Sequence, residues 1–389
     1  MSEYDVIVVG LGAMGSSAAY QLARRGQRVL GLEQFTPAHN LGSSHGASRI
    51  VRKAYFERPD YVPLLARTYE LWDELSADFG EQLFHRCGAL MIGRPDSEVV
   101  AGTLESVRRW NLSHEVLDPA GMRERFPQFT LPDDQVAVYE AGAGYARPEA
   151  AVLANVELAV DAGAELWFDT TVESIELGPS GVHLSADGEQ LSAPKVVLAT
   201  GAWADRLANL DGFGLGVQRQ TVHWFQPAQP ADFTEDRFPV YLWEVPTPAE
   251  LPPAQLYGFP CLPGETLAKA ALYRDGSSAT VNPDALNRSV TAADYDRLQG
   301  LLAGTLPGLA GAPPVRSDVC MYPISADNDF LLGLHPGSSG RVVLAVGFGG
   351  HGFKFVPVVG EIVADLVIDG STRHEIGFLS PERVRAASH

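Results

Sequence analysis

Residues 4–33 read YDVIVVGLGAMGSSAAYQLARRGQRVLGLE, and this stretch decides the fold. The pattern predicts a buried strand over residues 4–9, a helix rich in small side chains over 13–25 and a second buried strand over 28–33. Strand, helix and strand in this order form a βαβ unit, whose two strands lie parallel in one sheet. We therefore expect an α/β domain built on this unit.

The glycine motif GLGAMG separates the first strand from the helix. Gly10 permits a tight turn, Gly12 lets the backbone approach a pyrophosphate, and Gly15 lets the helix pack closely on the strand. The pyrophosphate then lies at the helix N-terminus, where unpaired N–H groups and the helix dipole favour an anion. Glu33 stands 18 residues after Gly15, where a carboxylate can bind ribose hydroxyls and repels the 2′-phosphate of NADP. The motif predicts FAD or NAD, and the alternative is a glycine turn without a ligand.

Length and composition indicate a folded protein with room for two domains. The chain has 389 residues, of which 46% are hydrophobic and 20% are charged. Its net charge of −19 repels phosphate backbones, so nucleic acid is not expected as a partner. The same charge works against capture of an anion, so a carboxylate substrate needs local basic residues. No run reaches the ~18 apolar residues of a membrane span, so no membrane partner is expected.

Cysteine usage favours a reducing compartment. Cys87, Cys261 and Cys320 are odd in number and form no CxxC pair, which argues against a disulfide framework or a zinc cluster. The apolar residues before Gly10 follow no basic leader and break into glycines, which argues against a signal peptide. We therefore expect a cytoplasmic location. The sequence contains no HExxH motif and no clustered histidine and aspartate ligands, so no metal site is expected, and no serine nucleophile elbow is present either.

Further along, α/β segments alternate with β-rich insertions. Short strands separated by proline and glycine turns between about 217 and 275 indicate an antiparallel sheet, and loops are expected around 117–134. Helices are predicted over residues 61–79, 148–164 and 356–368, and strands over 88–93, 195–200 and 342–348.

Because α/β segments recur at both ends and in the middle, two consecutive domains do not explain the pattern. A discontinuous two-domain protein, α/β plus α+β, explains it better. The dinucleotide-binding domain is expected to comprise residues 1–87, 145–216 and 320–389, and the substrate domain residues 88–144 and 217–319.

Several stretches carry a resemblance to a known family. They read GSSHGASRIVR at 42–52, YGFP at 257–260 followed by Lys269, VCMYP at 319–323, the stretch 327–336, and GFGGHGFK at 347–354. In this order and spacing, the chain resembles the monomeric sarcosine oxidase and N-methyltryptophan oxidase family of FAD-dependent amine oxidases, in the D-amino acid oxidase-like superfamily. The resemblance covers nearly the whole chain. It implies a Rossmann-like FAD-binding domain with a discontinuous, antiparallel-sheet substrate domain.

The resemblance implies a covalent flavin. Cys320, in VCMY, matches the cysteine that in the family forms a thioether to the 8-methyl carbon of the flavin ring. Such a link fixes the ring and tends to raise its reduction potential, which favours removal of hydride from an amine. Outside this context the thiol reads as a small buried side chain, and we interpret Cys87 and Cys261 in that way.

Arg52 and Lys354 are expected to hold a substrate carboxylate. Arginine presents a planar fork that grips a carboxylate, and lysine adds a compact charge. The alternative is a pair of solvated surface cations. Lys354, however, stands in the apolar run VGFGGHGFKFV, where a charge needs a partner. In the run RIVRKAY, we expect Lys53 rather than Arg52 to be the solvated residue.

Arg49 and Lys269 resemble the family's basic residues beside the flavin. The reaction of reduced flavin with oxygen passes through superoxide, so a fixed positive charge near the ring stabilises that intermediate. The family pattern assigns Lys269 to oxygen activation, although residues 261–268 carry one extra residue relative to it.

Other candidates remain open between two interpretations. His45 lies near the flavin's attachment edge in the family, or it is a plain loop histidine. Tyr257 and Tyr322 either place hydroxyls near the substrate or pack as ordinary aromatics. Tyr273 stands where sarcosine oxidases carry a histidine, and Leu242 falls where the family lines its substrate cavity. These replacements disfavour sarcosine itself and indicate a more apolar pocket for a bulkier substrate.

The residues expected to contact FAD lie in the glycine loop, the end of the second strand and the motifs of the resemblance. They are Gly10, Gly12, Ala13, Met14, Gly15, Glu33, Gln34, Ser43, Ser44, Ser48, Arg49, Thr200, Gly201, Trp203, Cys320, Met321, Gly347, Gly350, His351, Gly352 and Lys354.

Together these features imply a monomeric, FAD-dependent oxidase of a small amino acid that carries a secondary amine and is bulkier than sarcosine. Hydride passes to flavin N5, oxygen is reduced to hydrogen peroxide, and the imine hydrolyses. Three alternatives are kept: a dehydrogenase that uses another electron acceptor, a glycine oxidase or D-amino acid oxidase type of activity, and a non-catalytic flavoprotein.

Overall fold

The N-terminal βαβ unit forms the centre of a mostly parallel, six-stranded sheet. A computed structural model describes residues 3–178, 181–207, 213–247, 253–274 and 280–386. Strand β1 (Val6–Val9), helix α1 (Ala13–Ala23) and strand β2 (Val29–Leu32) follow the prediction, with ends shifted by at most two residues. The sheet order is β19 (Leu331–Leu334), β20 (Val342–Val346), β13 (Lys195–Leu198), β1, β2 and β9 (Glu165–Trp167), with β19 antiparallel to its neighbour.

Helix α1 is buried along its whole length because it lies between the sheet and two further helices. It contacts α5 (Pro148–Asp161) and α7 (Val356–Ile368), both predicted from the sequence. A Cβ added to Gly15 would lie 1.7 Å from the carbonyl oxygen of Gly10, so only glycine permits this approach of helix to turn. The predicted packing of the glycine motif is therefore confirmed.

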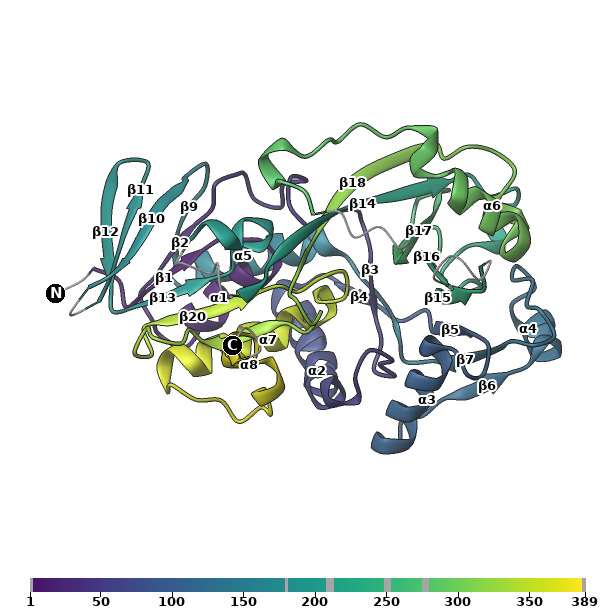
Figure 1. Cartoon of the computed structure of the whole chain (residues 1–389), viewed down its shortest axis with the longest axis horizontal. Helices are drawn as coiled ribbons and strands as arrows, with labels where there is room; N and C mark the ends of the chain where they lie inside the picture. Colours follow the sequence, from purple (N-terminus) through teal and green to yellow (C-terminus); the bar gives the residue numbers. More distant parts are fainter. Residues whose placement is uncertain (1–2, 179–180, 208–212, 248–252, 275–279, 387–389) are drawn as a thin grey trace.

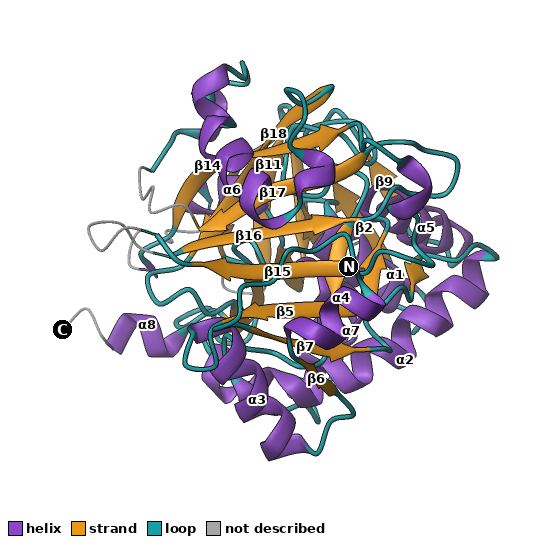
Figure 2. Cartoon of the chain, turned by 90° about the vertical axis from the view of Figure 1, so that its right-hand side faces the viewer, coloured by secondary structure: helices purple, strands orange, loops and turns teal. Residues whose placement is uncertain are grey.

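A second sheet, of eight strands, forms the other half of the molecule (Figures 1 and 2). Most neighbours are antiparallel, as predicted, but β15 pairs in parallel with β5. Its order is β18 (Arg316–Ile324), β14 (Gly216–Phe225), β17 (Ala268–Arg274), β16 (Ala254–Phe259), β15 (Val240–Val245), β5 (Ala89–Gly93), β7 (Val136–Glu140) and β6 (Glu115–Leu117).

Helices accompany the eight-stranded sheet at α3 (Glu98–Trp110), α4 (Pro119–Arg125) and α6 (Asp296–Thr305). The expectation of loops around 117–134 is wrong for α4. Asp118 caps this helix by accepting a hydrogen bond of 2.8 Å from the Gly121 backbone N–H, and Pro119 stands in the first turn. The same proline and aspartate that suggested a loop therefore begin a helix.

Two three-stranded sheets complete the fold. One is the antiparallel set β10 (Val172–Leu177), β11 (Val182–Ala186) and β12 (Glu189–Ala193), which the sequence did not predict. The other has β8 (Gly144–Ala146) between β3 (Arg49–Val51) and β4 (Phe84–His85). It lies between the halves in Figure 1 and carries Arg49.

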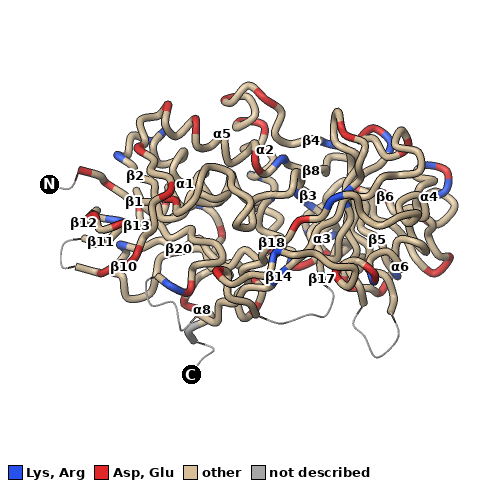
Figure 3. Tube along the Cα trace, turned by 90° about the horizontal axis from the view of Figure 1, so that it is seen from above, with Lys and Arg blue, Asp and Glu red and all other residues tan. Residues whose placement is uncertain are grey.

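The remaining helices are α2 (Val62–Phe79), which was predicted, and α8 (Glu382–Ala386). Gly80, with φ of 81°, ends α2 in the left-handed conformation that glycine favours. Within the described chain, we find no helix with the length and apolar character needed to cross a membrane. Acidic residues are spread along the periphery of the trace in Figure 3.

Candidate active site

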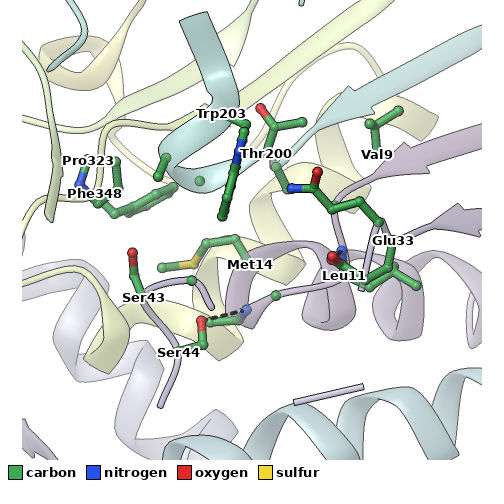
Figure 4. Close-up of a pocket in the computed structure, with 18 of the residues that line it drawn as sticks. Val9, Leu11, Met14, Glu33, Ser43, Ser44, Thr200, Trp203, Pro323 and Phe348 are labelled. Atoms are coloured by element: carbon green, nitrogen blue, oxygen red, sulfur yellow. Dashed lines mark hydrogen bonds between the residues drawn. The ribbon is translucent and has the colours of Figure 1, made fainter. Parts of the chain in front are cut away.

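A long groove opens along the carboxyl ends of β1, β2 and β13 (Figure 4). Ligands of α/β sheets bind at this edge. Gly10, with φ of 87°, turns the chain so tightly that an added Cβ would lie 2.6 Å from the carbonyl oxygen of Ala199. At Gly12 the nearest atom to an added Cβ is the Ser44 hydroxyl oxygen at 3.6 Å, so the backbone here faces open space. A pyrophosphate requires a backbone that it can approach closely and open space in front of that backbone, and this turn provides both.

Glu33 closes one end of the groove. Its carboxylate accepts hydrogen bonds from the backbone N–H groups of Leu11 at 2.7 Å and Phe35 at 3.1 Å. Charge-assisted bonds of this kind hold the glycine loop against the end of β2. The side chain still lines the groove, so the predicted contact with ribose hydroxyls is sterically open.

Polar groups and one aromatic ring line the middle of the groove. Ser44 accepts a 3.1 Å hydrogen bond from Ala13 N–H at the start of α1, and Ser43 donates one of 2.7 Å to the Met321 carbonyl oxygen. The Thr200 hydroxyl is buried and has no hydrogen-bond partner among the described residues. Buried polar groups normally have partners, so an atom missing one here fits a ligand such as FAD. Trp203 borders the same stretch.

Fourteen of the residues expected at FAD line this groove, and seven do not. Those in the groove are Gly10, Gly12, Ala13, Met14, Glu33, Gln34, Ser43, Ser44, Arg49, Thr200, Gly201, Trp203, Gly350 and Gly352. Those outside its lining are Gly15, Ser48, Cys320, Met321, Gly347, His351 and Lys354. The sequence missed the stretch 170–173, which also lines it and whose polar residues form no recognisable motif.

A second, smaller cavity adjoins the far end of the groove. Arg49, Tyr322, Gly350 and Phe353 line both spaces, so the cavity and the groove share a wall. The cavity brings together all five residues predicted to bind substrate, from distant parts of the chain: Arg52, Leu242, Tyr257, Tyr273 and Lys354. Its other lining residues are Ile50, Glu57, Val222, Phe259, Cys320 and His351.

Arg52 is 2% exposed and already has a partner. Its Nη2 donates to Glu57 Oε2 at 2.7 Å, and its Nη1 donates to the Ala54 carbonyl oxygen at 2.9 Å. Burial opposes both charges, but their attraction prevails: the pKa of Arg52 stays above, and the pKa of Glu57 below, the ordinary value. The sequence analysis missed Glu57, because only the fold shows that the 52–57 segment turns back on Arg52.

Lys354 is 5% exposed, in agreement with its apolar sequence context. Its Nζ donates to the His351 carbonyl oxygen at 2.7 Å and lies 5.0 Å from the centre of the Tyr55 ring. Burial and the positive charge of Arg52 lower the pKa of Lys354 to about 7, although Glu57 acts in the opposite direction. The lysine therefore changes charge near neutral pH.

Among the described residues, Lys269 is not part of the lining of the groove or of the smaller cavity, and it lies behind the cavity wall. Its Nζ donates to the carbonyl oxygens of Gly46 and Ser48, each at 2.7 Å, and it lies 4.0 Å from the centre of the Phe259 ring. Burial and nearby Arg49 lower its pKa well below the ordinary value. The lysine is thus held by a loop that itself belongs to the groove.

Arg49 and Cys320 meet at the junction of the two spaces. Arg49 Nη2 approaches Cys320 Sγ at 3.8 Å and donates to the Ser43 carbonyl oxygen at 2.9 Å. Arg49 Nη1 donates to the Ser48 carbonyl oxygen at 2.9 Å, so Ser48 serves both Arg49 and Lys269. Cys320 therefore lies beside a fixed positive charge, where the cavity adjoins the groove.

Tyr257 lines the cavity and Tyr322 lines both spaces, whereas His45 is buried and is not among the described lining of either. Burial, followed by the charge of Arg49, lowers the pKa of His45 to about 4, so the imidazole is neutral at pH 7. Its Nε2 has no hydrogen-bond partner among the described residues. Tyr257 and Tyr322 are hydrogen-bonded to each other, and burial raises the pKa of both hydroxyls. Tyr273 is buried, with its ring centre 6.1 Å from that of Tyr322.

The comparisons with known proteins agree with this geometry. A family model described as FAD dependent oxidoreductase matches residues 5–366. The chain is 44% identical over 386 residues to monomeric sarcosine oxidase of Streptomyces avermitilis, covering 99% of this chain and 98% of that protein. It is 33% identical over 368 residues to N-methyl-L-tryptophan oxidase of Salmonella heidelberg, covering 94% of this chain and 95% of that protein.

Solved structures give the same result. The open form of NikD, described as an unusual amino acid oxidase essential for nikkomycin biosynthesis, has a TM-score of 0.85 at 27% identity over 98% of both chains. Glycine oxidase from Geobacillus kaustophilus, at 23% identity and a TM-score of 0.79 over 97% of this chain and 98% of that one, shares the fold. The family match, the two full-length relatives and the groove together show that this chain belongs to the FAD-dependent oxidoreductase family and is an FAD-dependent amine oxidase.

Proposed function

We propose that the enzyme oxidises a C–N bond of a small amino acid that carries a secondary amine and is bulkier than sarcosine, with oxygen as the electron acceptor. The observation that carries the proposal is one cavity, next to the cofactor groove, that combines the basic side chains of Arg49, Arg52 and Lys354 with a largely aromatic and apolar remainder; Glu57 is the acidic residue in its described lining. Bound FAD supplies the two-electron acceptor and reduces oxygen to hydrogen peroxide; the protein supplies binding, orientation and electrostatics. The released imine hydrolyses in water.

Arg52 and Lys354 bind the substrate carboxylate in this proposal. Both side chains are buried, so their interaction with an anion is weakly screened. Arg52 presents its fork already paired with Glu57, and a carboxylate must share or take over that guanidinium. This competition favours a substrate whose carboxylate reaches Lys354 at the same time.

The apolar wall sets the size of the substrate. Leu242, Phe259 and Tyr273 line the cavity and are buried. An aromatic ring at position 273 offers packing surface to a larger N-substituent or side chain. The hydrogen-bonded pair Tyr257 and Tyr322 offers hydroxyl groups to orient the amine.

Oxygen reduction is assigned to Lys269, supported by Arg49. Arg49 lines both the groove and the cavity, and Lys269 is tied to it through the Ser48 carbonyl oxygen that both residues bind; a fixed cation here stabilises superoxide as it forms. The enzyme acts as a monomer in this proposal, as the name of its sarcosine-oxidising relative indicates for that protein.

Cys320 is proposed to hold FAD covalently. Acid precipitation of the purified protein, followed by centrifugation, tests this without any assay of activity. Yellow colour should stay with the pellet of the wild type and appear in the supernatant of Cys320→Ser. Cys261→Ser is the matched control, because Cys261 is buried in a separate cluster and should leave the colour in the pellet. Colour in the wild-type supernatant overturns the covalent link.

The substrate class is tested by anaerobic bleaching of the flavin with a panel of N-methyl amino acids, cyclic imino acids, N-carboxymethyl amines and sugar–amine conjugates. Secondary amino acids larger than sarcosine should bleach the flavin fastest, and analogues without the carboxylate should be poor. Equal bleaching by analogues without the carboxylate overturns the assignment of Arg52 and Lys354. In air, one hydrogen peroxide per substrate is expected; a lower yield indicates a dehydrogenase with another electron acceptor.

A further inference from the structure

We propose that Glu140 and Glu149 are positioning residues, which hold the two ends of the 46–54 segment so that Lys269 and Arg49 face the flavin side and Arg52 faces the substrate side. This inference rests on the proposed function for the roles of the three cations. The geometry that carries it consists of backbone N–H groups held by the two carboxylates.

Glu149 holds the first end. Its carboxylate accepts hydrogen bonds from Gly46 N–H at 2.6 Å and from Ala47 N–H at 3.1 Å. Glu149 stands in the first turn of α5, where the helix dipole favours a negative charge. Bonds from a carboxylate to backbone N–H groups are about twice as strong as neutral ones. The contact links segments that are about one hundred residues apart in the sequence.

The turn that Glu149 holds has an unfavourable backbone. Gly46 has φ of 97° and Ala47 has φ of 66°, and a left-handed conformation is unfavourable for a residue such as alanine. Such a conformation persists only where surrounding contacts enforce it. The turn directs the carbonyl oxygens of Gly46 and Ser48 toward Lys269 Nζ, and that of Ser48 also toward Arg49. Glu149 therefore acts on both cations through two carbonyl groups.

Glu140 holds the other end in the same manner. Its carboxylate, 8% exposed, accepts hydrogen bonds from Lys53 N–H at 3.0 Å and Ala54 N–H at 2.9 Å. Tyr69 donates to it as well, at 3.1 Å. Ala54 is the link to the substrate side, because its carbonyl oxygen accepts from Arg52 Nη1 at 2.9 Å.

Between the two carboxylates, strand β3 pairs with β8 in an antiparallel ladder. Arg49 lies opposite Ala146, and Val51 lies opposite Gly144. The stretch 140–149 therefore runs alongside 46–54 and holds it at three places: one carboxylate at each end and the ladder between. Because the two ends are held separately, loss of the Glu149 carboxylate should disturb Lys269 and Arg49 and spare Arg52. Loss of the Glu140 carboxylate should do the reverse.

The first experiment separates the two ends by kinetics. Glu149→Gln should slow flavin reoxidation by oxygen about tenfold, because a small displacement of a catalytic charge strongly lowers the reaction rate. The Kd for a carboxylate analogue without an oxidisable amine should stay near the wild-type value. Glu140→Gln should show the reverse: a Kd raised about tenfold with near-normal reoxidation. Glu157→Gln, an exposed acid on the same helix as Glu149, is the control and should change neither quantity.

The second experiment does not depend on the flavin reaction. Amide hydrogen exchange should become faster at residues 46–47 in Glu149→Gln and at 53–54 in Glu140→Gln, with the other end protected as in the wild type. If Glu140→Gln does not fold, Glu140→Asp keeps the charge and shortens its reach, and the same local loss of protection is expected. Uniform loss of protection at both ends, or equal effects on both kinetic quantities, overturns the inference.

The failure of this inference differs from the failure of the proposed function. If Lys269→Met slows reoxidation and Glu149→Gln does not, the lysine has its proposed role but does not depend on Glu149. If Lys269→Met leaves reoxidation unchanged, the proposed role of the lysine is wrong, and the exchange experiment still decides whether Glu149 holds the turn.

Discussion

The cofactor groove and the smaller cavity beside it share a wall but are built in different ways. At one end the groove is shaped by the backbone of a contiguous motif, with Gly10 and Gly12 supplying the turn and Glu33 held against it, although segments such as 170–173 and 199–203 also line it. The cavity is made of side chains from segments far apart, and its charged residues are arranged by the long-range contact of Glu140 with the backbone at residues 53–54 and by the pairing of Arg52 with Glu57, five residues further on. A shape that the backbone makes can be predicted from a local sequence motif, whereas the positions of charged side chains depend on the tertiary structure.

The largest effect is expected in the cavity, at Arg52. Arg52→Ala should weaken binding of a carboxylate analogue by about 2–5 kcal/mol, because it leaves Glu57 as a buried charge without its partner. Titration of the flavin absorbance spectrum measures this affinity. The double variant Arg52→Ala with Glu57→Gln should recover thermal stability without recovering affinity. If it recovers both, Arg52 acts only as the partner of Glu57.

The next effect concerns the boundary between the two regions. Lys269→Met should leave anaerobic reduction of the flavin largely intact and slow reoxidation by roughly 10²–10³-fold, because superoxide forms without its stabilising charge. Stopped-flow absorbance measures both steps. Lys53→Met, whose ammonium lies over the Tyr69 ring outside the cavity, is the matched control. Slow reduction with normal reoxidation would instead make Lys269 part of substrate binding.

A smaller effect is expected in the groove, where two glycines with similar backbone angles form a matched pair. Gly10→Ala adds a Cβ that would overlap the Ala199 carbonyl, whereas Gly26→Ala meets nothing within 4 Å at a comparable positive φ. Gly26→Ala should cost about 1 kcal/mol of stability, from conformation alone. Gly10→Ala should cost about 1–3 kcal/mol more and reduce the FAD content per chain. Equal losses in both variants, measured by denaturant unfolding and by absorbance, would contradict the close approach at Gly10.

The smallest effect is one of pH. With a pKa of about 7, lowered first by burial and then by Arg52, Lys354 is charged below that pH and neutral above it. Affinity for a carboxylate analogue should therefore fall as pH rises from about 7, by at most about tenfold per pH unit, which is 1.4 kcal/mol. In Lys354→Met this dependence should disappear. A Kd that is constant between pH 6 and 9 in the wild type would show that the lysine does not contact the ligand.

The same contrast explains what the sequence could predict. The βαβ unit, its glycines and helices 62–79 and 356–368 follow from local patterns, since periodicity and turn chemistry act over a few residues. The chain-wide resemblance placed Arg52, Lys354 and Tyr322 in one region. Glu57, Glu140 and Glu149 escaped, because an isolated glutamate looks the same on a surface and against a backbone turn.

The helix 119–125 and the three strands of 172–193 were also missed, for a related reason. Asp118 and Pro119 are typical both of loops and of helix starts, and only the capping contact to Gly121 separates the two. In β10, four of the six residues are exposed, so apolar alternation is weak where this small sheet meets solvent. A local sequence pattern therefore predicts a structure only where it is compatible with a single backbone conformation.

Three cations, Arg52, Lys269 and Lys354, are almost completely buried within one neighbourhood of this protein. For the two lysines, burial lowers the pKa, so the folded chain disfavours the charged form of each side chain. Enzymes commonly tolerate an unfavourable local arrangement of this kind where activity requires it. A directed-evolution screen that scored heat resistance alone would therefore not select for either charge, beyond the hydrogen bonds that the two lysines donate to backbone carbonyl oxygens. Any thermostabilisation of this enzyme needs a parallel selection for turnover.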